Sequence, residues 1–344
     1  MSSPAKIGAR WACVMFSGEW PFKRGVRICG ATIGLASNNG SLITDPQYFE
    51  SMILQSLLTD VWRIESVAYE GGMDGEFWVH DVPGSLLSCC EENEGHRLVL
   101  EGDFSGAERS CSDNRYSLFG NLGLFFRYLL VVLERRGVFS FHASGIYRES
   151  DNHLVMFIGP AGCGKTVFVL SAVEEGWKVL TVEMAHCEFQ GSDLAVHKGA
   201  LYDNVRVGSL TVDFPGAIEP LRIEIPDTQD IWSHKFAVDL SPVAVESECL
   251  VNPKISVIFP KVEMGRGDPE ILELPKGRGL RRKLFDNLTE KIASTLLLYD
   301  ELPVQGFDSP KPGEARLGFV DKFMDRIVGA RSVLTGPKNC MKGI

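Results

Sequence analysis

Short apolar runs separated by polar turns occupy the N-terminal part of the chain. Strand-like runs lie at residues 26–35, 66–69, 77–80 and 96–100, and one stretch with helical spacing lies at 46–60. The polar stretch at 105–114 has the composition of a linker. This pattern predicts a small mixed α/β domain over residues 1–117, in which we find no catalytic motif.

The apolar runs become longer after residue 117 and alternate between the helical and the strand period. We expect helices at 118–136, 165–175, 279–299 and 314–333, and strands at 139–147, 153–158, 178–182, 209–214, 221–225, 235–240 and 254–259. This alternation predicts an α/β domain over residues 118–344. The most apolar window, 122–133, contains Arg127 and is shorter than the ~20 residues that cross a bilayer, so we expect a buried helix there.

The segment between the strand at 153–158 and the helix at 165–175 matches the phosphate-binding pattern G-x-x-x-x-G-K-[ST]. Its residues are Gly159, Pro160, Ala161, Gly162, Cys163, Gly164, Lys165 and Thr166. The glycines let backbone N–H groups turn toward phosphate oxygens, and the helix that follows adds the partial positive charge of its N-terminus. Lys165 can reach the β and γ phosphates, and the Thr166 hydroxyl can ligate Mg²⁺. The alternative is a glycine-rich turn that only connects two core elements, but the order of strand, loop and helix favours ATP and Mg²⁺ as ligands.

A further Mg²⁺ ligand is expected at the end of a neighbouring strand, where such sites usually place a carboxylate. The apolar strand at 178–182 is followed by Glu183, which we select for this role. Asp213 and Asp239 are rivals, although each lies inside an alternating strand, where an outward and solvated carboxylate is the usual arrangement. The chain has no Asn-Lys-x-Asp motif for reading guanine, which argues against a GTPase.

Composition narrows the classes of partner. The chain has 344 residues, of which 44% are hydrophobic, and a formal net charge of −10. This charge argues against sequence-independent binding of nucleic acid, which requires a surplus of Lys and Arg. Four basic residues nevertheless gather near residue 280 and indicate either a solvated helix start or a site for an acidic ligand. They are Arg278, Arg281, Arg282 and Lys283.

Cysteine usage and the N-terminus bear on the compartment. The chain has nine cysteines without C-x-x-C spacing, so we expect no zinc site. The N-terminal residues lack a basic segment followed by a long apolar run, so we expect no secretory signal and no membrane partner. These features predict a cytoplasmic protein. They leave its oligomeric state open, with a homo-oligomer as one option.

Three segments together resemble the C-terminal catalytic domain of the HPr kinase/phosphorylase group. They are Phe141-His142-Ala143-Ser144-Gly145, the phosphate loop, and Glu175-Gly176-Trp177-Lys178-Val179-Leu180 followed by an acid. The resemblance is specific over residues 139–185 and weaker after them. It implies a fold similar to that of phosphoenolpyruvate carboxykinase, namely a mixed-sheet catalytic domain behind a smaller N-terminal α/β domain. It also implies phosphoryl transfer from ATP, since relatives in this group phosphorylate free serine or peptide tails.

The resemblance assigns roles to individual residues. The family has a histidine on the strand before the phosphate loop, and His142 matches it. Two consecutive aspartates normally follow the next strand, one serving as base and one supporting Mg²⁺; here Val182 and Glu183 occupy their places. The family's HPr-specific signature is not recognisable, so we do not expect HPr as the substrate.

The expected activity is therefore phosphoryl transfer from ATP to the hydroxyl of a small molecule or peptide. In this interpretation Lys165 stabilises the moving phosphate, Thr166 and Glu183 hold Mg²⁺, and His142 or Glu183 takes the hydroxyl proton. His186 is a third candidate base. Two alternatives stay open: a nucleotide-binding protein that has lost catalysis, which Val182 would explain, and a phosphorylase, hydrolase or carboxykinase-like enzyme on the same scaffold.

Overall fold

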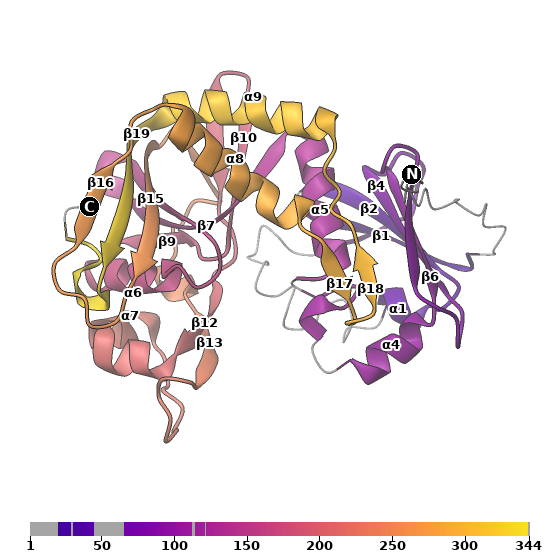
Figure 1. Ribbon diagram of the computed structural model, residues 1–344, viewed down its shortest axis with the longest axis horizontal. Coiled ribbons are helices and arrows are strands. Elements are labelled where there is room, and N and C mark those ends of the chain that lie inside the picture. Colours follow the sequence, from indigo (N-terminus) through magenta and orange to yellow (C-terminus); the bar gives the residue numbers. More distant parts are fainter. Residues whose placement is uncertain (1–19, 29, 45–64, 112–113, 121, 343–344) are drawn as a thin grey trace, which may run out of the picture.

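The computed structural model describes residues 20–28, 30–44, 65–111, 114–120 and 122–342. These residues form two lobes, each built on its own β-sheet (Figure 1). Helices α8 (Arg278–Ala293) and α9 (Pro310–Arg326) extend from one lobe toward the other. Parallel and antiparallel strand pairs occur together in both main sheets, which confirms the predicted mixed α/β class. No helix in the described part of the chain combines the length and the apolar character needed to cross a membrane.

The first lobe contains a six-stranded sheet with the strand order β3-β1-β2-β4-β6-β5. Its strands are β1 (Phe22–Ile28), β2 (Ala31–Ser37), β3 (Glu65–Val67), β4 (Gly75–Asp81), β5 (Ser88–Glu92) and β6 (Arg97–Gly102). Helix α5 (Leu124–Arg135) packs on this sheet, where the rings of Phe125 and Tyr128 lie 5.4 and 6.0 Å from the ring of Phe77 in β4. The short helix α1 (Ser41–Thr44) also contributes to this core. The first sheet therefore buries one face beneath a helix that is apolar along most of its length.

Two expectations for this lobe are wrong. The single strand expected at 26–35 is a hairpin of β1 and β2, with Gly30 at a φ of +74° in the turn, a conformation that glycine adopts without steric cost. The expected linker at 105–114 contains helix α4 (Phe104–Ser110), which starts where the Asp103 carboxylate accepts a hydrogen bond from the Gly106 N–H. The helix expected at 46–60 lies outside the described residues.

The second lobe contains a nine-stranded sheet ordered β14-β11-β10-β7-β8-β15-β19-β16, with β9 paired to β7. Its strands are β7 (Val138–Arg148), β8 (His153–Ile158), β9 (Lys178–Thr181), β10 (Met184–Gln190), β11 (Asp193–His197), β14 (Cys249–Val251), β15 (Lys254–Val262), β16 (Glu270–Glu273) and β19 (Ile327–Thr335). The strands β8, β15 and β19 are adjacent and parallel in it, and helix α6 (Lys165–Glu174) follows β8. The expected strands at 139–147, 153–158, 178–182 and 254–259 and the expected helix at 165–175 are confirmed.

A two-stranded ribbon of β12 (Tyr202–Arg206) and β13 (Lys235–Asp239) lies beside this sheet, and the expected strand at 235–240 is confirmed there. The strand expected at 209–214 is wrong, since Ser209–Asp213 forms a π-helical turn. Leu210 and Phe214, four residues apart, are buried while Val212 between them is 46% exposed, which is helical spacing. The strand expected at 221–225 is also absent, and helix α7 (Ile218–Leu221) ends at its start.

Three expected helices are shorter in the structure. The helix expected at 118–136 begins only at Leu124, and the helix expected at 279–299 ends at Ala293 before the strands β17 (Leu296–Leu298) and β18 (Leu302–Val304). The helix expected at 314–333 ends at Arg326, where β19 begins. Helix α5 and the hairpin β17–β18 pack into the core of the first lobe, so this core draws on residues well beyond 117. The domain division expected between residues 117 and 118 stays a prediction.

Candidate functional site

The phosphate loop lies where β8 ends and α6 begins, so the predicted strand, loop and helix are confirmed. Gly162 and Gly164 have φ values of +81° and +105°, which side chains other than glycine rarely adopt. A Cβ at Gly164 would also lie 2.3 Å from Val262 Cγ2 in the adjacent strand β15. Because the Val262 N–H donates to the Cys163 carbonyl at 3.2 Å, β15 holds the loop closely. The loop therefore has the backbone conformation that its glycine pattern predicts.

Lys165 is buried, and its ammonium group points back along the loop. Its Nζ donates to the carbonyl oxygens of Gly159 at 2.8 Å and Pro160 at 3.2 Å, and it lies 3.0 Å from His142 Nε2. Burial lowers the pKa of Lys165, while neighbouring acidic groups, Glu183 among them, oppose that shift. The lysine of the phosphate loop and the histidine of β7 are thus in direct contact.

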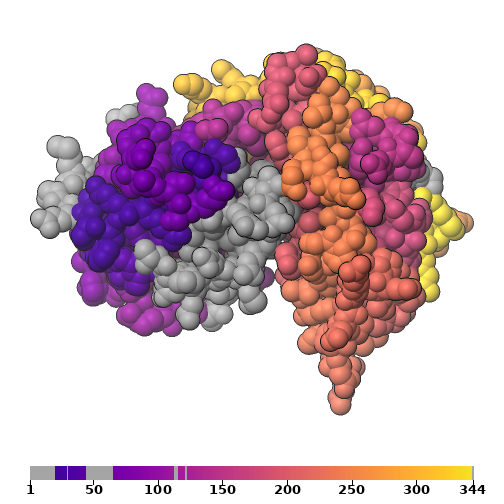
Figure 2. All heavy atoms as spheres, turned by 180° about the vertical axis from the view of Figure 1, so that it is seen from behind, coloured from indigo at the N-terminus to yellow at the C-terminus, as the bar shows by residue number. Residues whose placement is uncertain are grey.

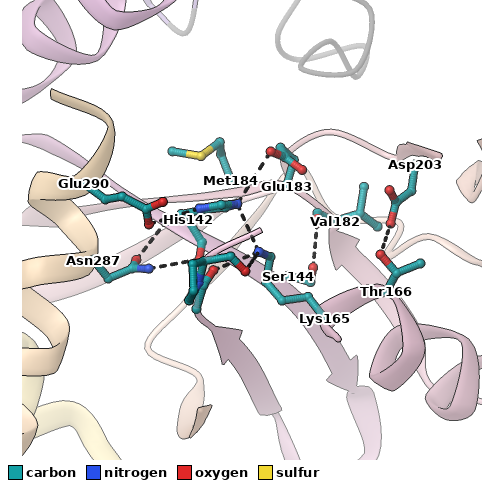
Figure 3. Close-up of polar contacts among 12 residues, drawn as sticks. His142, Ser144, Lys165, Thr166, Val182, Glu183, Met184, Asp203, Asn287 and Glu290 are labelled. Carbon is teal, nitrogen blue, oxygen red and sulfur yellow. Dashed lines mark hydrogen bonds and ion pairs between the residues drawn. The ribbon is translucent and has the colours of Figure 1, made fainter. Parts of the chain in front are cut away.

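His142 is held on three sides (Figure 3). Its backbone N–H donates to Asn287 Oδ1 at 2.9 Å, and Asn287 Nδ2 donates back to the His142 carbonyl at 3.3 Å. Its Nδ1 lies 3.3 Å from Glu290 Oε2, and the hydrogen bond to His142 lowers the pKa of Glu290. Since Lys165 donates to Nε2, the proton of a neutral imidazole belongs on Nδ1, from which it is donated to Glu290. Helix α8 therefore orients the ring and leaves a basic lone pair beside the phosphate loop.

Glu183 and Val182 lie in the turn between β9 and β10. The Glu183 carboxylate lies 3.7 Å from His142 Nε2, and its side chain is 40% exposed. Val182 is only 2% exposed and packs in the hydrophobic core with Phe168 of helix α6, and it also borders the cavity beside Glu183. At the two positions where the resemblance implies an acidic pair, an apolar side chain and one carboxylate therefore meet the cavity.

Thr166 has a carboxylate partner that the sequence analysis did not identify. Its Oγ1 donates to Asp203 Oδ2 of β12 at 2.6 Å. Desolvation raises the pKa of Asp203 to about 6, and the Glu183 charge contributes in the same direction, against the hydrogen bond from Thr166. The Thr166 hydroxyl at the start of α6 and the Asp203 carboxylate that it contacts are ligand types that Mg²⁺ takes when it binds together with phosphates.

The residues expected to bind Mg²⁺ carry oxygen donors, which are the ligands that this ion takes. Within the described residues, no group of three or more His, Cys, Asp or Glu side chains is arranged to hold a metal. Mg²⁺ that is bound together with substrate phosphates needs only one or two protein carboxylates and keeps several waters. Thr166 with Asp203 or Glu183 meets this smaller requirement.

These side chains surround one cavity of about 740 Å³. Its lining includes His142, Glu183 and Asp203 together with the phosphate-loop residues Ala161, Gly162, Gly164, Lys165 and Thr166. The sequence-predicted base, lysine and Mg²⁺ ligands are thus brought together, although they come from three different segments of the chain. Gly159, Pro160 and Cys163 complete the loop through their backbone groups.

Of the alternative candidates for the carboxylate and the base, one lines the cavity and two do not. Asp213 lines the cavity, and burial raises its pKa. Asp239 lies outside the described lining, where it accepts hydrogen bonds from the Tyr202 hydroxyl at 3.4 Å and the Ser241 N–H at 2.8 Å. His186 is buried in the sheet, 2.8 Å from the Ser140 hydroxyl, and burial lowers its pKa to about 3. Neither Asp239 nor His186 is placed to act on a ligand in the cavity.

The basic cluster at the start of α8 has structural partners. Arg281 forms two hydrogen bonds to the Asp321 carboxylate of α9, at 2.6 and 2.5 Å. Lys283 lies 5.0 Å from the centre of the Phe259 ring, and Arg282 pairs with Asp286 along the helix. These contacts favour the solvated helix start over an acidic-ligand site.

Asp203, Asn287 and Glu290 are the site residues that the sequence analysis missed. Asn287 carried a usable signal, because it interrupts the apolar stripe of α8 between Leu284 and Leu288. Glu290 follows it by one turn on the same side of the helix. Asp203 shares the inward side of its strand with the buried Val205, so strand alternation marked it as an inward carboxylate.

No protein-family model matches this chain, and no curated protein matches its sequence. The residues that line the cavity therefore carry the inference about function.

Proposed function

We propose that the chain transfers the terminal phosphoryl group of ATP to a hydroxyl of a small molecule or peptide. The proposal rests on one observation above all: Lys165 of the phosphate loop lies 3.0 Å from the basic nitrogen of His142. This contact brings a group that neutralises phosphate charge together with a group that accepts a proton. Phosphoryl transfer to a hydroxyl requires these two functions and otherwise depends mostly on positioning.

Before a ligand binds, the Lys165 ammonium group occupies the nitrogen of His142 that is needed to accept a proton. Lys165 donates to His142 Nε2, and that lone pair is the one that must accept the hydroxyl proton. When Lys165 Nζ turns to the β and γ phosphates, Nε2 becomes free. The hydroxyl O–H bond then breaks toward Nε2, its oxygen bonds to the γ phosphorus, and the bond from phosphorus to the ADP oxygen breaks. Glu290, on the far side of the ring, stabilises the imidazolium that forms.

Mg²⁺, when bound, neutralises charge on the phosphates. Thr166, Asp203 and Glu183 would hold it. The raised pKa of Asp203 reflects its desolvation and the proximity of Glu183, and the positive charge of a bound cation would offset both effects.

The proposal is tested with labelled ATP and Mg²⁺ in the presence and absence of hydroxyl acceptors such as serine. We expect ADP formation that depends on the acceptor, with the label recovered on the acceptor hydroxyl. Label released only as inorganic phosphate would contradict the proposal and support a hydrolase.

A second function is favoured by Val182. Its side chain is 2% exposed in the core, so one member of the family's acidic pair is replaced by an apolar contact. This observation supports a nucleotide-binding regulatory or assembly protein without turnover. Tight ATP binding without ADP formation under any acceptor would identify this second function.

A further inference from the structure

An exposed aromatic side chain lines the same cavity as the phosphate loop. Trp232 is 40% exposed and stands in the segment that precedes β13. This segment forms the projection at the lower end of Figures 1 and 2. The proposed phosphoryl transfer makes no use of Trp232, and an accessible indole in a ligand cavity is a side chain that can stack on a planar ligand.

Neighbouring backbone groups hold Trp232 in place. The indole packs on Gly208, where an added Cβ would lie 2.6 Å from Trp232 Cε3. The Gly208 N–H donates to the Ile231 carbonyl at 2.6 Å, and the Trp232 N–H donates to Asp230 Oδ1 at 3.1 Å. A glycine is therefore required at 208 for close approach rather than for an unusual backbone angle, since its φ is −60°. The indole ring therefore packs on the backbone at Gly208 and remains partly exposed.

The contacts of the site place Trp232 and His142 at opposite ends. His142 contacts Lys165, the next residue Thr166 contacts Asp203, and β12 runs from Asp203 through Arg206 toward Gly208 and the indole. Asp203 and Arg206 are about 10 Å apart by strand geometry. Figure 3 shows the same order, with His142 on one side of Lys165 and the Thr166–Asp203 pair on the other.

The phosphate loop has a direction that agrees with this order. Lys165 reaches the β and γ phosphates, whereas the backbone N–H groups of the loop cradle the phosphates nearer the nucleoside. The hydroxyl acceptor therefore belongs at the His142 end. A base joined to its phosphates through a sugar reaches toward the other end, and Met264 and Pro337 add apolar surface to the lining of the same cavity.

We propose that Trp232 is the stacking platform for the base of the nucleotide. This inference rests on the proposed nucleotide site and adds how the nucleoside is held. Stacking uses the flat face that every base has, so the site accepts adenine and guanine nucleotides with similar affinity. The absence of a guanine-reading motif agrees with such tolerance.

The test compares ligands with and without a base. Binding of ATP, GTP and inorganic tripolyphosphate, each with Mg²⁺, is measured by calorimetry for the full chain and its variants. Trp232→Ala is expected to weaken ATP and GTP binding by about 10-fold or more and to leave tripolyphosphate binding unchanged. Trp232→Phe is expected to keep most of the affinity. Gly208→Ala, which displaces the indole, is expected to weaken ATP binding without affecting tripolyphosphate.

Tyr202→Ala is the matched control, because Tyr202 is 41% exposed on the same ribbon but lies outside the described lining of the cavity. It should bind all three ligands as the unaltered chain does. Unchanged ATP affinity in folded Trp232→Ala overturns this inference alone, and the nucleotide site then stands without a stacking platform. Failure of the unaltered chain to bind either ATP or tripolyphosphate overturns the nucleotide site and the inference together.

Discussion

The Thr166 hydroxyl donates to the Asp203 carboxylate at 2.6 Å, which links the first turn of α6 to strand β12. The two residues lie on the cavity, and Glu183 is close enough to raise the pKa of Asp203. If the Asp203 carboxylate supports Mg²⁺, removing its charge should lower the Mg²⁺-dependent turnover.

Asp203→Asn is expected to lower Mg²⁺-dependent turnover by about 10- to 100-fold, the range typical of groups that support a metal ligand. Turnover is measured against Mg²⁺ concentration, where the variant should require more metal. Asp239→Asn is the control, because Asp239 lies on the paired strand β13 outside the described lining. Equal Mg²⁺ dependence in both variants would argue against the role of Asp203.

Lys165→Ala is expected to abolish turnover and to weaken ATP binding, since Lys165 supplies the direct charge contact to the phosphates. It should also free His142 Nε2 permanently. Nucleotide binding is measured by calorimetry and folding by circular dichroism, with Lys178→Ala as an exposed control. A folded Lys165→Ala protein that turns over ATP normally would refute the phosphate site.

Glu183→Gln should retain nucleotide binding, because backbone groups form most of the cradle, and should lose a factor of ~10² in Mg²⁺-dependent transfer. Rates are compared with and without acceptor. Acceptor-dependent rates equal to those of the unaltered chain would transfer the carboxylate role to Asp203 or Asp213.

Val182→Asp is not expected to create a second working carboxylate beside Glu183. Position 182 is 2% exposed among apolar side chains, so a carboxylate there would be desolvated without an established partner. We expect a lower melting temperature and no gain in turnover, measured by thermal unfolding and ADP release. Val182 borders the cavity, so a gain in turnover at unchanged stability would show that a carboxylate at this position can take part in transfer.

Arg316 forms a buried ion pair that connects α9 to α5. Its guanidinium is fully buried and donates to both oxygens of Glu134 at 2.9 Å. Removing one partner leaves a buried charge, so Arg316→Ala should lower the free energy of unfolding by about 3–5 kcal/mol. The exposed pair of Arg282 and Asp286 is the comparison, and Arg282→Ala should change stability by less than about 1 kcal/mol in urea unfolding.

The buried His186 predicts a pH dependence of stability. Its folded-state pKa of about 3 lies below the value of about 6.5 for an exposed histidine, so the unfolded chain binds the proton more readily between these values. The contribution of His186 to stability is therefore complete above pH 6.5 and decreases by about 1.4 kcal/mol per pH unit as the pH falls toward 3. Urea unfolding at several pH values should show a shallower dependence for His186→Gln than for the unaltered chain. Equal slopes would contradict the assignment of a buried neutral imidazole.

Sequence reasoning succeeded where the chemistry is local. The phosphate loop depends on eight consecutive residues and two flanking elements, and all of these could be read from the chain. The partners of the site are distant: Glu290 is 148 residues from His142, and Asp203 is 37 residues from Thr166. Periodicity indicates which side of an element is buried but not which element it meets. The expected strand at 209–214 failed for a related reason, because Leu210 and Phe214 fit either spacing until the neighbouring ribbon is known.

Helix α8 touches both lobes within a short length. Asn287 and Glu290 hold His142 in the second lobe, whereas Ile292 belongs to the core of the first lobe and Arg127 of α5 donates to the Ser294 hydroxyl at 3.1 Å. Only about 7.5 Å of helix axis separates Asn287 from Ile292. The C-terminal end of α8 is therefore fixed in the core of the first lobe, while Asn287 and Glu290 of the same helix orient the His142 ring. Any repacking of the first lobe that slides α8 is expected to shift the basic nitrogen relative to Lys165, even when the phosphate loop itself stays still.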